Sequence, residues 1–303
     1  MYASHAFTRM EVISLAKTQK PGIHRGVSTY CWYPLYNVNM DLEDSFQIMQ
    51  DMGATGLEIL ADGIIDGYPY PSNEWLDKWF ALIDRYDIVP VEYGHWVESR
   101  LYRGRECTMD ESLEQLIHDI KLAGYLGFTC MRTKLGVIDE TLTPVKNWRE
   151  IIKAALPYAE KYNVVMQPEI HSPTKLKSAM MDDYCEFIDK EQTKHFGFNI
   201  DFGVFQTKGV DGMPSFRKFD PSAPEDIVPL LPYIHCCHAK YYNMSEDFEE
   251  TTIPYREVIK LMQDNGWNGY LLSEYEGPHK ENIYHCMTQV HRHHVMLKNI
   301  LGE

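Results

Sequence analysis

The chain has 303 residues, and its 29 Lys and Arg against 44 Asp and Glu give it a formal net charge of −15. This acidic balance disfavours the phosphate backbone of a nucleic acid as a partner. Hydrophobic residues at 44% and charged residues at 24% are typical of soluble globular proteins. No apolar run approaches the roughly 20 residues of a membrane span. The sequence therefore predicts neither nucleic-acid binding nor a transmembrane segment.

Seven cysteines are spread along the whole chain, and none of them belongs to a Cys-x-x-Cys pair. An odd number at wide spacing argues against a disulfide framework and against a cysteine zinc site. Residues 1–23 lack the uninterrupted apolar run of about 7–15 residues that a signal peptide needs. We therefore expect a cytoplasmic protein with an N-terminal arm over residues 1–23 and one folded domain over residues 24–303.

Short runs of apolar, β-branched or aromatic residues recur along the chain and predict strands. Each interval between them leaves room for a loop, an amphipathic helix and a return loop, which is the arrangement of parallel strands joined by crossovers. Eight such units predict an α/β fold of one closed (β/α)8 TIM barrel. The runs cover residues 26–31, 56–60, 88–93, 129–132, 164–169, 197–201, 234–239 and 270–274.

The segments between these strands have the apolar spacing of helices. The first of them places Leu42 and Phe46 on one side. The spacing of Thr108 and Glu111 is that of a capping box, which predicts that a helix begins at residue 108. The expected helices cover residues 41–52, 75–86, 108–123, 145–161, 175–190, 254–265 and 282–301.

Three connections after strand ends are unusually long or rich in Gly, Pro and aromatic residues, namely residues 62–72, 94–107 and 202–225. The carboxyl ends of the strands form the catalytic face of a barrel. We therefore interpret these extended loops as substrate-binding segments.

The last four predicted strands end in groups that bind cations, whereas the first four lack a similar series. Because a buried carboxylate without a partner is costly, we expect one divalent ion to be held by all four groups. Three carboxylates and one imidazole suit Mn²⁺ best, with Mg²⁺, Co²⁺ or Ni²⁺ as alternatives. For any single residue, the alternative is a strand-end group that bonds only to the protein. The four residues are Glu169, Asp201, His238 and Glu274.

Two histidines are candidates for proton transfer or substrate contact. His171 alternates with Glu169 along an extended segment and should lie beside that carboxylate. Its imidazole would act as a general acid or base, or would only orient Glu169. His95, near the end of the third strand, is a candidate substrate contact with a structural role as the alternative.

Further candidates for substrate binding lie at other strand ends. Lys240 should point the same way as His238, and would contact a substrate oxygen or pair with a ligand carboxylate. Arg132 ends the fourth strand and would face the barrel mouth. Tyr30 and Trp32 close the first strand, as an aromatic wall for a ligand or as packing.

A cluster over residues 291–294 (His-Arg-His-His) lies in the expected last helix. Consecutive helical residues spread around the axis and cannot converge on one ion. We expect this segment to form an exposed or interface surface.

Together these motifs resemble the xylose-isomerase-like TIM-barrel superfamily, which includes sugar isomerases, ketose 3-epimerases, inosose dehydratases and AP-endonuclease-type nucleases. The resemblance covers about residues 25–301 and is carried by GVSTYCW, GATGLEIL, PEIH, NIDFG, HCCHAK and SEYEG. It implies that Glu169, Asp201, His238 and Glu274 are metal ligands, and that in an epimerase Glu169 and Glu274 also exchange a proton with a sugar carbon. The charge of −15 and the single histidine ligand disfavour the nuclease branch.

Two departures from the epimerase pattern narrow the resemblance. Val204 stands where ketose 3-epimerases typically have a histidine, and their arginine after strand seven is absent. The chain is more similar to the α, catalytic, subunits of bacterial C-glycoside deglycosidases, which cleave the bond from a 3-keto sugar to its aglycone. This resemblance implies a divalent metal, proton abstraction through an enediolate, oligomer formation and a smaller β subunit as partner. The alternatives are a ketose 3-epimerase or other sugar isomerase, an inosose-dehydratase-like enzyme and a noncatalytic scaffold.

Overall fold

The computed structural model describes residues 21–97, 105, 107–135, 144–210 and 220–303. The strands form one sheet in which every pair of neighbours is parallel. The order is β5-β4-β3-β2-β1-β9-β8-β7-β6. Its two ends, β5 and β6, follow each other in the chain, so the sheet closes and the predicted TIM barrel is confirmed. The strands are β1 (Ile23–Ser28), β2 (Gly56–Leu60), β3 (Val89–Val97), β4 (Cys130–Leu135), β5 (Val165–Gln167), β6 (Glu169–Ile170), β7 (Phe198–Asp201), β8 (Ile234–Tyr241) and β9 (Gly269–Tyr275).

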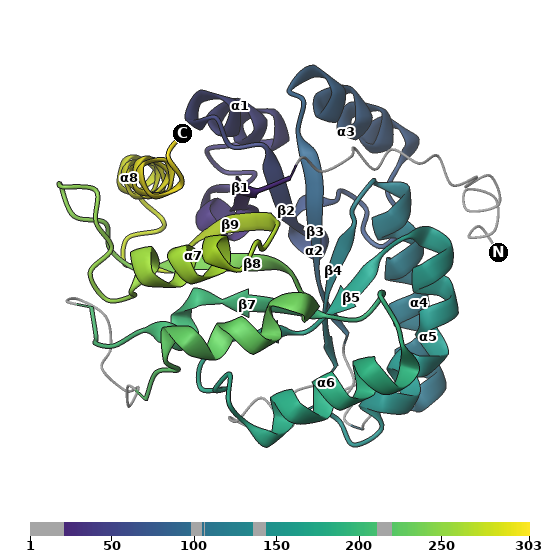
Figure 1. The fold of residues 1–303 in the computed structure, drawn as a ribbon. Helices are drawn as coiled ribbons and strands as arrows, with labels where there is room; N and C mark the ends of the chain where they lie inside the picture. The colour runs from purple at the N-terminus through teal and green to yellow at the C-terminus, as the bar shows by residue number, and fades with distance from the viewer. Residues whose placement is uncertain (1–20, 98–104, 106, 136–143, 211–219) are drawn as a thin grey trace.

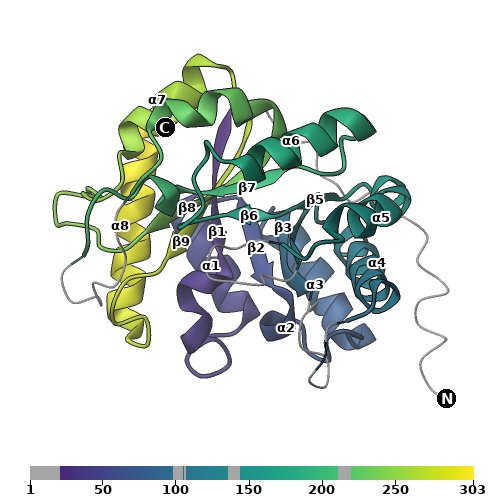
Figure 2. The same ribbon diagram turned by 90° about the horizontal axis from the view of Figure 1, so that it is seen from below.

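Helices surround this barrel on the outside, as two perpendicular views show (Figure 1, Figure 2). Their apolar faces pack on the sheet, where Phe46, Trp79 and Leu116 are fully buried. The predicted helices are present, and α2, η2, η3 and η4 were not predicted. The helices are η2 (Thr29–Leu35), α1 (Leu42–Met52), α2 (Ala61–Ile64), α3 (Asn73–Arg85), α4 (Met109–Tyr125), α5 (Trp148–Tyr162), α6 (Ala179–Glu191), η3 (Phe202–Phe205), η4 (Pro224–Tyr233), α7 (Tyr255–Asp264) and α8 (Ile283–Leu301).

The capping box predicted at Thr108 is confirmed. The Thr108 Oγ1 atom accepts a hydrogen bond from the Glu111 backbone N–H at 3.2 Å, and Glu111 Oε2 accepts one from the Thr108 N–H at 2.8 Å. Two of the N–H groups that a helix leaves without partners are thereby satisfied at the start of α4.

The fifth predicted strand is split at Pro168, which has no N–H to donate to a ladder. Its carbonyl oxygen still accepts a hydrogen bond from the Asn199 N–H at 3.1 Å. The chain direction is therefore kept across the split, and Glu169 follows as the first residue of β6.

The prediction that Tyr30 and Trp32 close the first strand is wrong. Strand β1 ends at Ser28, whose side chain accepts a hydrogen bond from the Tyr30 N–H at 3.2 Å. This cap starts the 3₁₀ helix η2, which carries both aromatic residues. The indole of Trp32 has no exposed surface and belongs to the core.

The prediction of an exposed or interface surface at residues 291–294, in the middle of α8, is also wrong for two histidines. His293 and His294 are buried, because α8 packs on β9 with one face. The Nδ1 atom of His293 lies 2.7 Å from Ser273 Oγ, and its Nε2 atom lies 3.0 Å from the Tyr255 hydroxyl. These polar partners make a buried imidazole tolerable in an apolar stripe.

The predicted N-terminal arm lies almost wholly outside the described residues, as do residues 98–104, 106 and 211–219 of two predicted loops. In the part of the chain that is described, no helix is both long and apolar enough to cross a membrane.

Candidate functional site

Four strands bring the predicted cation-binding groups together inside the carboxyl end of the barrel. Glu169 begins β6, Asp201 ends β7, and His238 and Glu274 lie on β8 and β9. All four are buried, and one ligand atom from each lies within 4.8 Å of the others. Parallel neighbouring strands produce this convergence because their carboxyl ends meet at one edge. We call these four residues the carboxylate cluster.

The imidazole of His238 lies at the centre of the carboxylate cluster. Its Nδ1 atom is 3.2 Å from Glu169 Oε1 and 3.4 Å from Glu274 Oε2. Burial alone lowers the pKa of His238, but the charges of Glu58 and Glu274 outweigh it and hold that pKa well above the ordinary value. In this arrangement, the imidazole supplies positive charge to the surrounding carboxylates.

Lys240 supplies a second positive charge to the cluster. Its Nζ atom lies 2.6 Å from Asp201 Oδ2, 3.3 Å from Glu274 Oε2 and 3.0 Å from Glu276 Oε2. Burial nevertheless raises the pKa of Asp201 to about 7, against the opposing influence of Lys240. Of the two roles considered for Lys240, the geometry provides the pairing with ligand carboxylates.

Arg132 adds a guanidinium beside Glu169. Its Nη1 atom lies 3.3 Å from Glu169 Oε2, and its side chain is buried. Burial alone raises the pKa of Glu169, but the hydrogen bond with His238 and the charges of His238 and Arg132 hold it well below the ordinary value. Glu169 is therefore ionised at neutral pH, as a metal ligand or a base must be.

The donor set fits a hard divalent cation. It offers three carboxylates and one imidazole, which is the mixture that Mn²⁺ and similar ions accept. Asp201 Oδ2 and Glu274 Oε2 are buried and accept no hydrogen bond from the described residues. Buried carboxylate oxygens of this kind require a cation, and here the ammonium group of Lys240 lies beside both.

His171 follows β6 directly, two residues after Glu169, and so lies near the carboxylate cluster. Its Nδ1 atom is 2.7 Å from the carbonyl oxygen of Ser172. A carbonyl only accepts hydrogen bonds, so Nδ1 carries the proton and the lone pair of the neutral ring is on Nε2.

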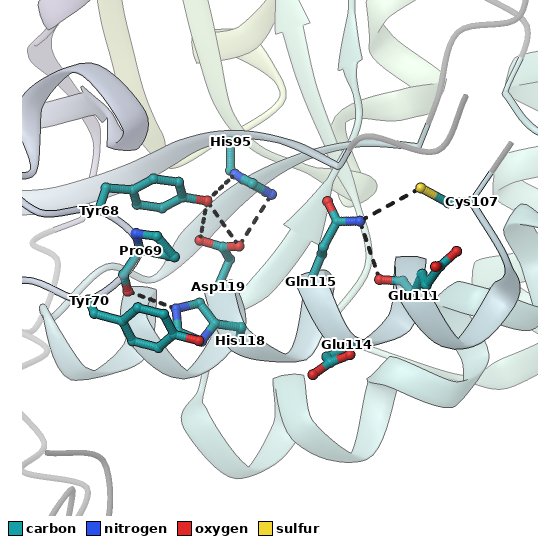
Figure 3. Close-up of a pocket in the computed structure, with 10 residues that line it drawn as sticks. All are labelled: Tyr68, Pro69, Tyr70, His95, Cys107, Glu111, Glu114, Gln115, His118 and Asp119. Atoms are coloured by element: carbon teal, nitrogen blue, oxygen red, sulfur yellow. Dashed lines mark hydrogen bonds and ion pairs between the residues drawn. The ribbon is translucent and has the colours of Figure 1, made fainter. Parts of the chain in front are cut away.

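His95 does not join the carboxylate cluster. Side chains alternate along β3, so His95 lies on the face opposite to Glu92 and contacts α4. Its Nδ1 atom lies 3.1 Å from the Tyr68 hydroxyl, and its Nε2 atom lies 3.3 Å from Asp119 Oδ2 (Figure 3). These residues line a cavity of about 530 Å³ outside the barrel, to which no member of the cluster contributes.

The two aromatic candidates on η2 differ in their surroundings. The hydroxyl of Tyr30 lies 3.5 Å from Glu276 Oε1, at the edge of the carboxylate cluster. The Lys280 Nζ atom lies 3.4 Å from the centre of the Tyr30 ring, a contact that was not predicted. Trp32, in contrast, lies within the core and offers a ligand no surface.

Two acidic residues of the first four strands, which were not among the predicted site residues, also lie beside His238. Glu58 on β2 and Glu92 on β3 are fully buried, and an oxygen of each lies 3.0 Å from His238 Nε2. The sequence pattern could have indicated these two glutamates as site residues, because each is a lone acid inside a mostly apolar strand. Such an acid needs a partner from elsewhere in the fold.

Curated relatives share most of their length with this chain. A 3'-dehydrocarminate deglycosidase alpha subunit from Microbacterium sp is 24% identical, over 92% of this chain and 95% of the relative. A C-glycoside deglycosidase alpha subunit from Arthrobacter globiformis is 22% identical, over 85% of each.

Solved structures share the fold at lower identity. The IOLI protein with a zinc atom aligns with a TM-score of 0.66 at 13% identity, over 92% of this chain and 98% of that one. D-psicose 3-epimerase with D-tagatose from Clostridium cellulolyticum H10 aligns with a TM-score of 0.65 at 14% identity, over 92% and 99%. A family model, described as xylose isomerase-like TIM barrel, matches residues 46–290. This match spans most of the barrel, so the chain belongs to the xylose isomerase-like TIM barrel family.

Proposed function

We propose that this protein is a divalent-metal-dependent enzyme that removes a proton beside the carbonyl group of a sugar. More specifically, we propose the catalytic subunit of a C-glycoside deglycosidase, which cleaves the carbon–carbon bond of a 3-keto C-glycoside. The observation that carries this proposal is the convergence of Glu169, Asp201, His238 and Glu274 within 4.8 Å. The names of the two curated relatives point to the same reaction class.

The four residues of the carboxylate cluster would hold the ion, for which Mn²⁺ is our first choice. A bound divalent ion stabilises the negative charge that develops on a carbonyl oxygen when a neighbouring C–H proton is removed. Lys240 and Arg132 keep the carboxylates of Asp201 and Glu169 paired, and therefore positioned.

The proposed base is His171, whose neutral ring has its lone pair on Nε2. It would take the proton from the sugar carbon beside the carbonyl. The electron pair of that C–H bond would form a carbon–carbon double bond as the bond to the aglycone breaks. The aglycone carbon would then take up a proton, so that no oxidant or reductant is consumed. Tyr30, at the edge of the cluster, is the proposed aromatic contact for the substrate.

A ketose 3-epimerase is the second candidate. In that reaction Glu169 and Glu274 would move a proton off and onto one sugar carbon, with no bond to an aglycone broken. The fold similarity to D-psicose 3-epimerase favours this candidate. The residue Val204, in place of the histidine typical of epimerases, weighs against it.

The relatives are named alpha subunits, so we also propose that a smaller beta subunit associates with this chain. A location in the reducing cytoplasm remains a prediction from the cysteine pattern.

The test is to incubate the Mn²⁺-loaded protein with free ketoses, inositol ketones and 3-keto C-glycosides, and to identify the products by mass. Deglycosidation gives two products whose masses add up to that of the glycoside. Equilibration of ketoses without any action on glycosides would replace the first candidate by the second. Activity on none of these compounds, alone or with a beta subunit added, would contradict both.

A further inference from the structure

We propose that a layer of buried polar side chains beneath the carboxylate cluster fixes the orientation of the His238 ring, with an N–H on Nε2 donated to the layer and with Nδ1 directed toward the cluster. The layer consists of Glu58, Glu92, Gln167 and Asn199, and none of these residues belongs to the carboxylate cluster. The inference rests on the proposed function, since it explains how the chain prepares one ligand for a metal ion.

The layer crosses the barrel interior from four strands. Glu58 and Glu92 come from β2 and β3, and Gln167 and Asn199 come from β5 and β7. All four side chains have no exposed surface. Glu92 lies at the centre, because its Oε1 accepts a hydrogen bond from Gln167 Nε2 at 2.8 Å and its Oε2 accepts one from Asn199 Nδ2 at 2.8 Å.

The direction of these hydrogen bonds follows from one group that cannot change its role. The backbone N–H of His238 only donates, and it donates to Asn199 Oδ1 at 2.9 Å. The orientation of the Asn199 amide is thereby fixed, so its Nδ2 must be the atom that donates to Glu92. Glu92 Oε2 is consequently an acceptor.

The same oxygen of Glu92 lies 3.0 Å from His238 Nε2. Since Glu92 Oε2 already accepts from Asn199, we assign the proton of this contact to Nε2, which donates it. Glu58 Oε2, also 3.0 Å from Nε2, provides a second acceptor for this N–H. A ring turned by 180° would place a carbon atom against two buried carboxylates, which is unfavourable.

The consequence for the carboxylate cluster is geometric. With Nε2 donating to the layer, Nδ1 faces Glu169 and Glu274 at 3.2 and 3.4 Å. A metal ion that displaces the Nδ1 proton would therefore meet its lone pair inside the cluster. A carboxylate that accepts from the far nitrogen of a metal-binding histidine fixes the ring and raises the basicity of the near nitrogen. Glu92 and Asn199 are therefore positioning residues.

The same atoms also allow a competing interpretation. Glu58, Glu92 and the imidazole of His238 are close enough together to hold a second ion. Such an ion would require Nε2 to lose its proton. It would also compete for the oxygens of Glu92 with the two amide groups that already donate hydrogen bonds to them. The hydrogen-bonded layer satisfies these donors without an ion, and we therefore favour it.

Nitrogen-15 NMR of histidine-labelled protein tests the position of the proton directly. We expect His238 Nε2 to carry a proton in the metal-free protein and in the Zn²⁺-loaded protein. Absence of this proton in either state would overturn the inference. Because this measurement does not depend on a variant, it stands even if changes in the layer prevent folding. A parent protein that binds no Zn²⁺ would contradict the proposed function, while the metal-free spectrum would still show whether Nε2 carries a proton.

Zn²⁺ titration of three variants provides the second test. Glu92→Gln and Asn199→Asp should weaken Zn²⁺ binding by about 10- to 100-fold, as is typical when the partner of a metal-binding histidine is changed. Gln289→Glu is the matched control, because Gln289 is also a buried amide but bonds to Met244, away from the cluster. It should bind Zn²⁺ like the parent. Parental affinity in both layer variants, or two ions per parent chain of which Glu58→Gln removes one, would overturn the inference.

Discussion

The ammonium group of Lys240 lies 2.6 Å from Oδ2 of Asp201, inside the cluster of residues proposed to hold a metal ion. The same Nζ atom lies 3.3 Å from Oε2 of Glu274. The chain thus carries its own cation at two of the four proposed ligands. A divalent ion that binds there has to compete with this ammonium group.

Replacement Lys240→Met should therefore increase the affinity for Mn²⁺. Removal of a buried positive charge near the ion favours binding by more than about tenfold, given the strength of charge interactions at such distances. The metal-free variant should also unfold at a lower temperature, because its carboxylates lose a counter-charge. Calorimetric titration and thermal unfolding measure both effects. Lys260→Met, on the exposed face of α7, is the control. Unchanged or weaker Mn²⁺ binding would contradict the competition.

Glu276 lies near the proposed ligands without belonging to them. It pairs with Lys240 at 3.0 Å and is 29% exposed, whereas Glu274 is 4% exposed. Glu276→Gln should therefore retain the ion, and Glu274→Gln should lose most of it. Metal analysis after gel filtration distinguishes the two variants. Loss of the ion from the Glu276 variant alone would mean that the wrong glutamate has been assigned.

His171→Ala tests the proposed base. The four proposed ligands remain in this variant, so its metal content should equal that of the parent. Turnover of a 3-keto C-glycoside should fall by roughly 10²- to 10⁴-fold, as is typical for a lost general base. The pH profile should lose the limb in the histidine range. His118→Ala, in the cavity outside the barrel, is the control. A parental rate in the His171 variant would leave His171 only a role in orienting Glu169.

The barrel and the convergence of four residues were predictable from local patterns. Once the strands are parallel, groups at their carboxyl ends must meet, and Glu169, Asp201, His238 and Glu274 stand at those ends. His95 was a candidate at the end of a third strand predicted to stop at residue 93, whereas β3 continues to Val97. Within that longer strand, alternation turns His95 away from the barrel interior.

Contacts across the barrel could not be derived from local patterns. Glu58 and Glu92 reach His238 from β2 and β3, although 180 and 146 residues separate them from it in the chain. The residues that neighbour either glutamate in the sequence do not predict its contact with His238. The burial of Trp32 depends in a similar way on the cap at Ser28, which bends the chain after β1.

Buried histidines predict a loss of stability in mild acid. Burial, with the charge of Arg25 adding to it, lowers the pKa of His294 to about 3. The unfolded chain has a histidine pKa near 6.5, so it binds protons first as the pH falls. The contribution of neutral His294 is therefore complete above about pH 6.5 and decreases below it, by about 1.4 kcal/mol per pH unit.

His294→Asn should reduce this acid sensitivity. The asparagine oxygen can still accept from Arg25 Nη1, which lies 3.2 Å from His294 Nδ1. Between about pH 7 and pH 5 the parent should lose about 2 kcal/mol more free energy of unfolding than the variant. Urea denaturation at both pH values measures the difference. His279→Asn, a change at an exposed histidine, should leave the pH dependence as in the parent. Equal losses in the parent and the His294 variant would contradict this prediction.

Calorimetric titration of the metal-free protein with Mn²⁺ tests the central claim most directly. The parent is expected to bind one ion per chain, with an increase in thermal stability of about 2.7 kcal/mol when the free ion is at 100 times its dissociation constant. Glu169→Ala, Asp201→Ala, His238→Ala and Glu274→Ala should each weaken that binding and abolish activity together. A parent that binds no divalent ion, or four variants that bind Mn²⁺ as the parent does, would contradict the claim.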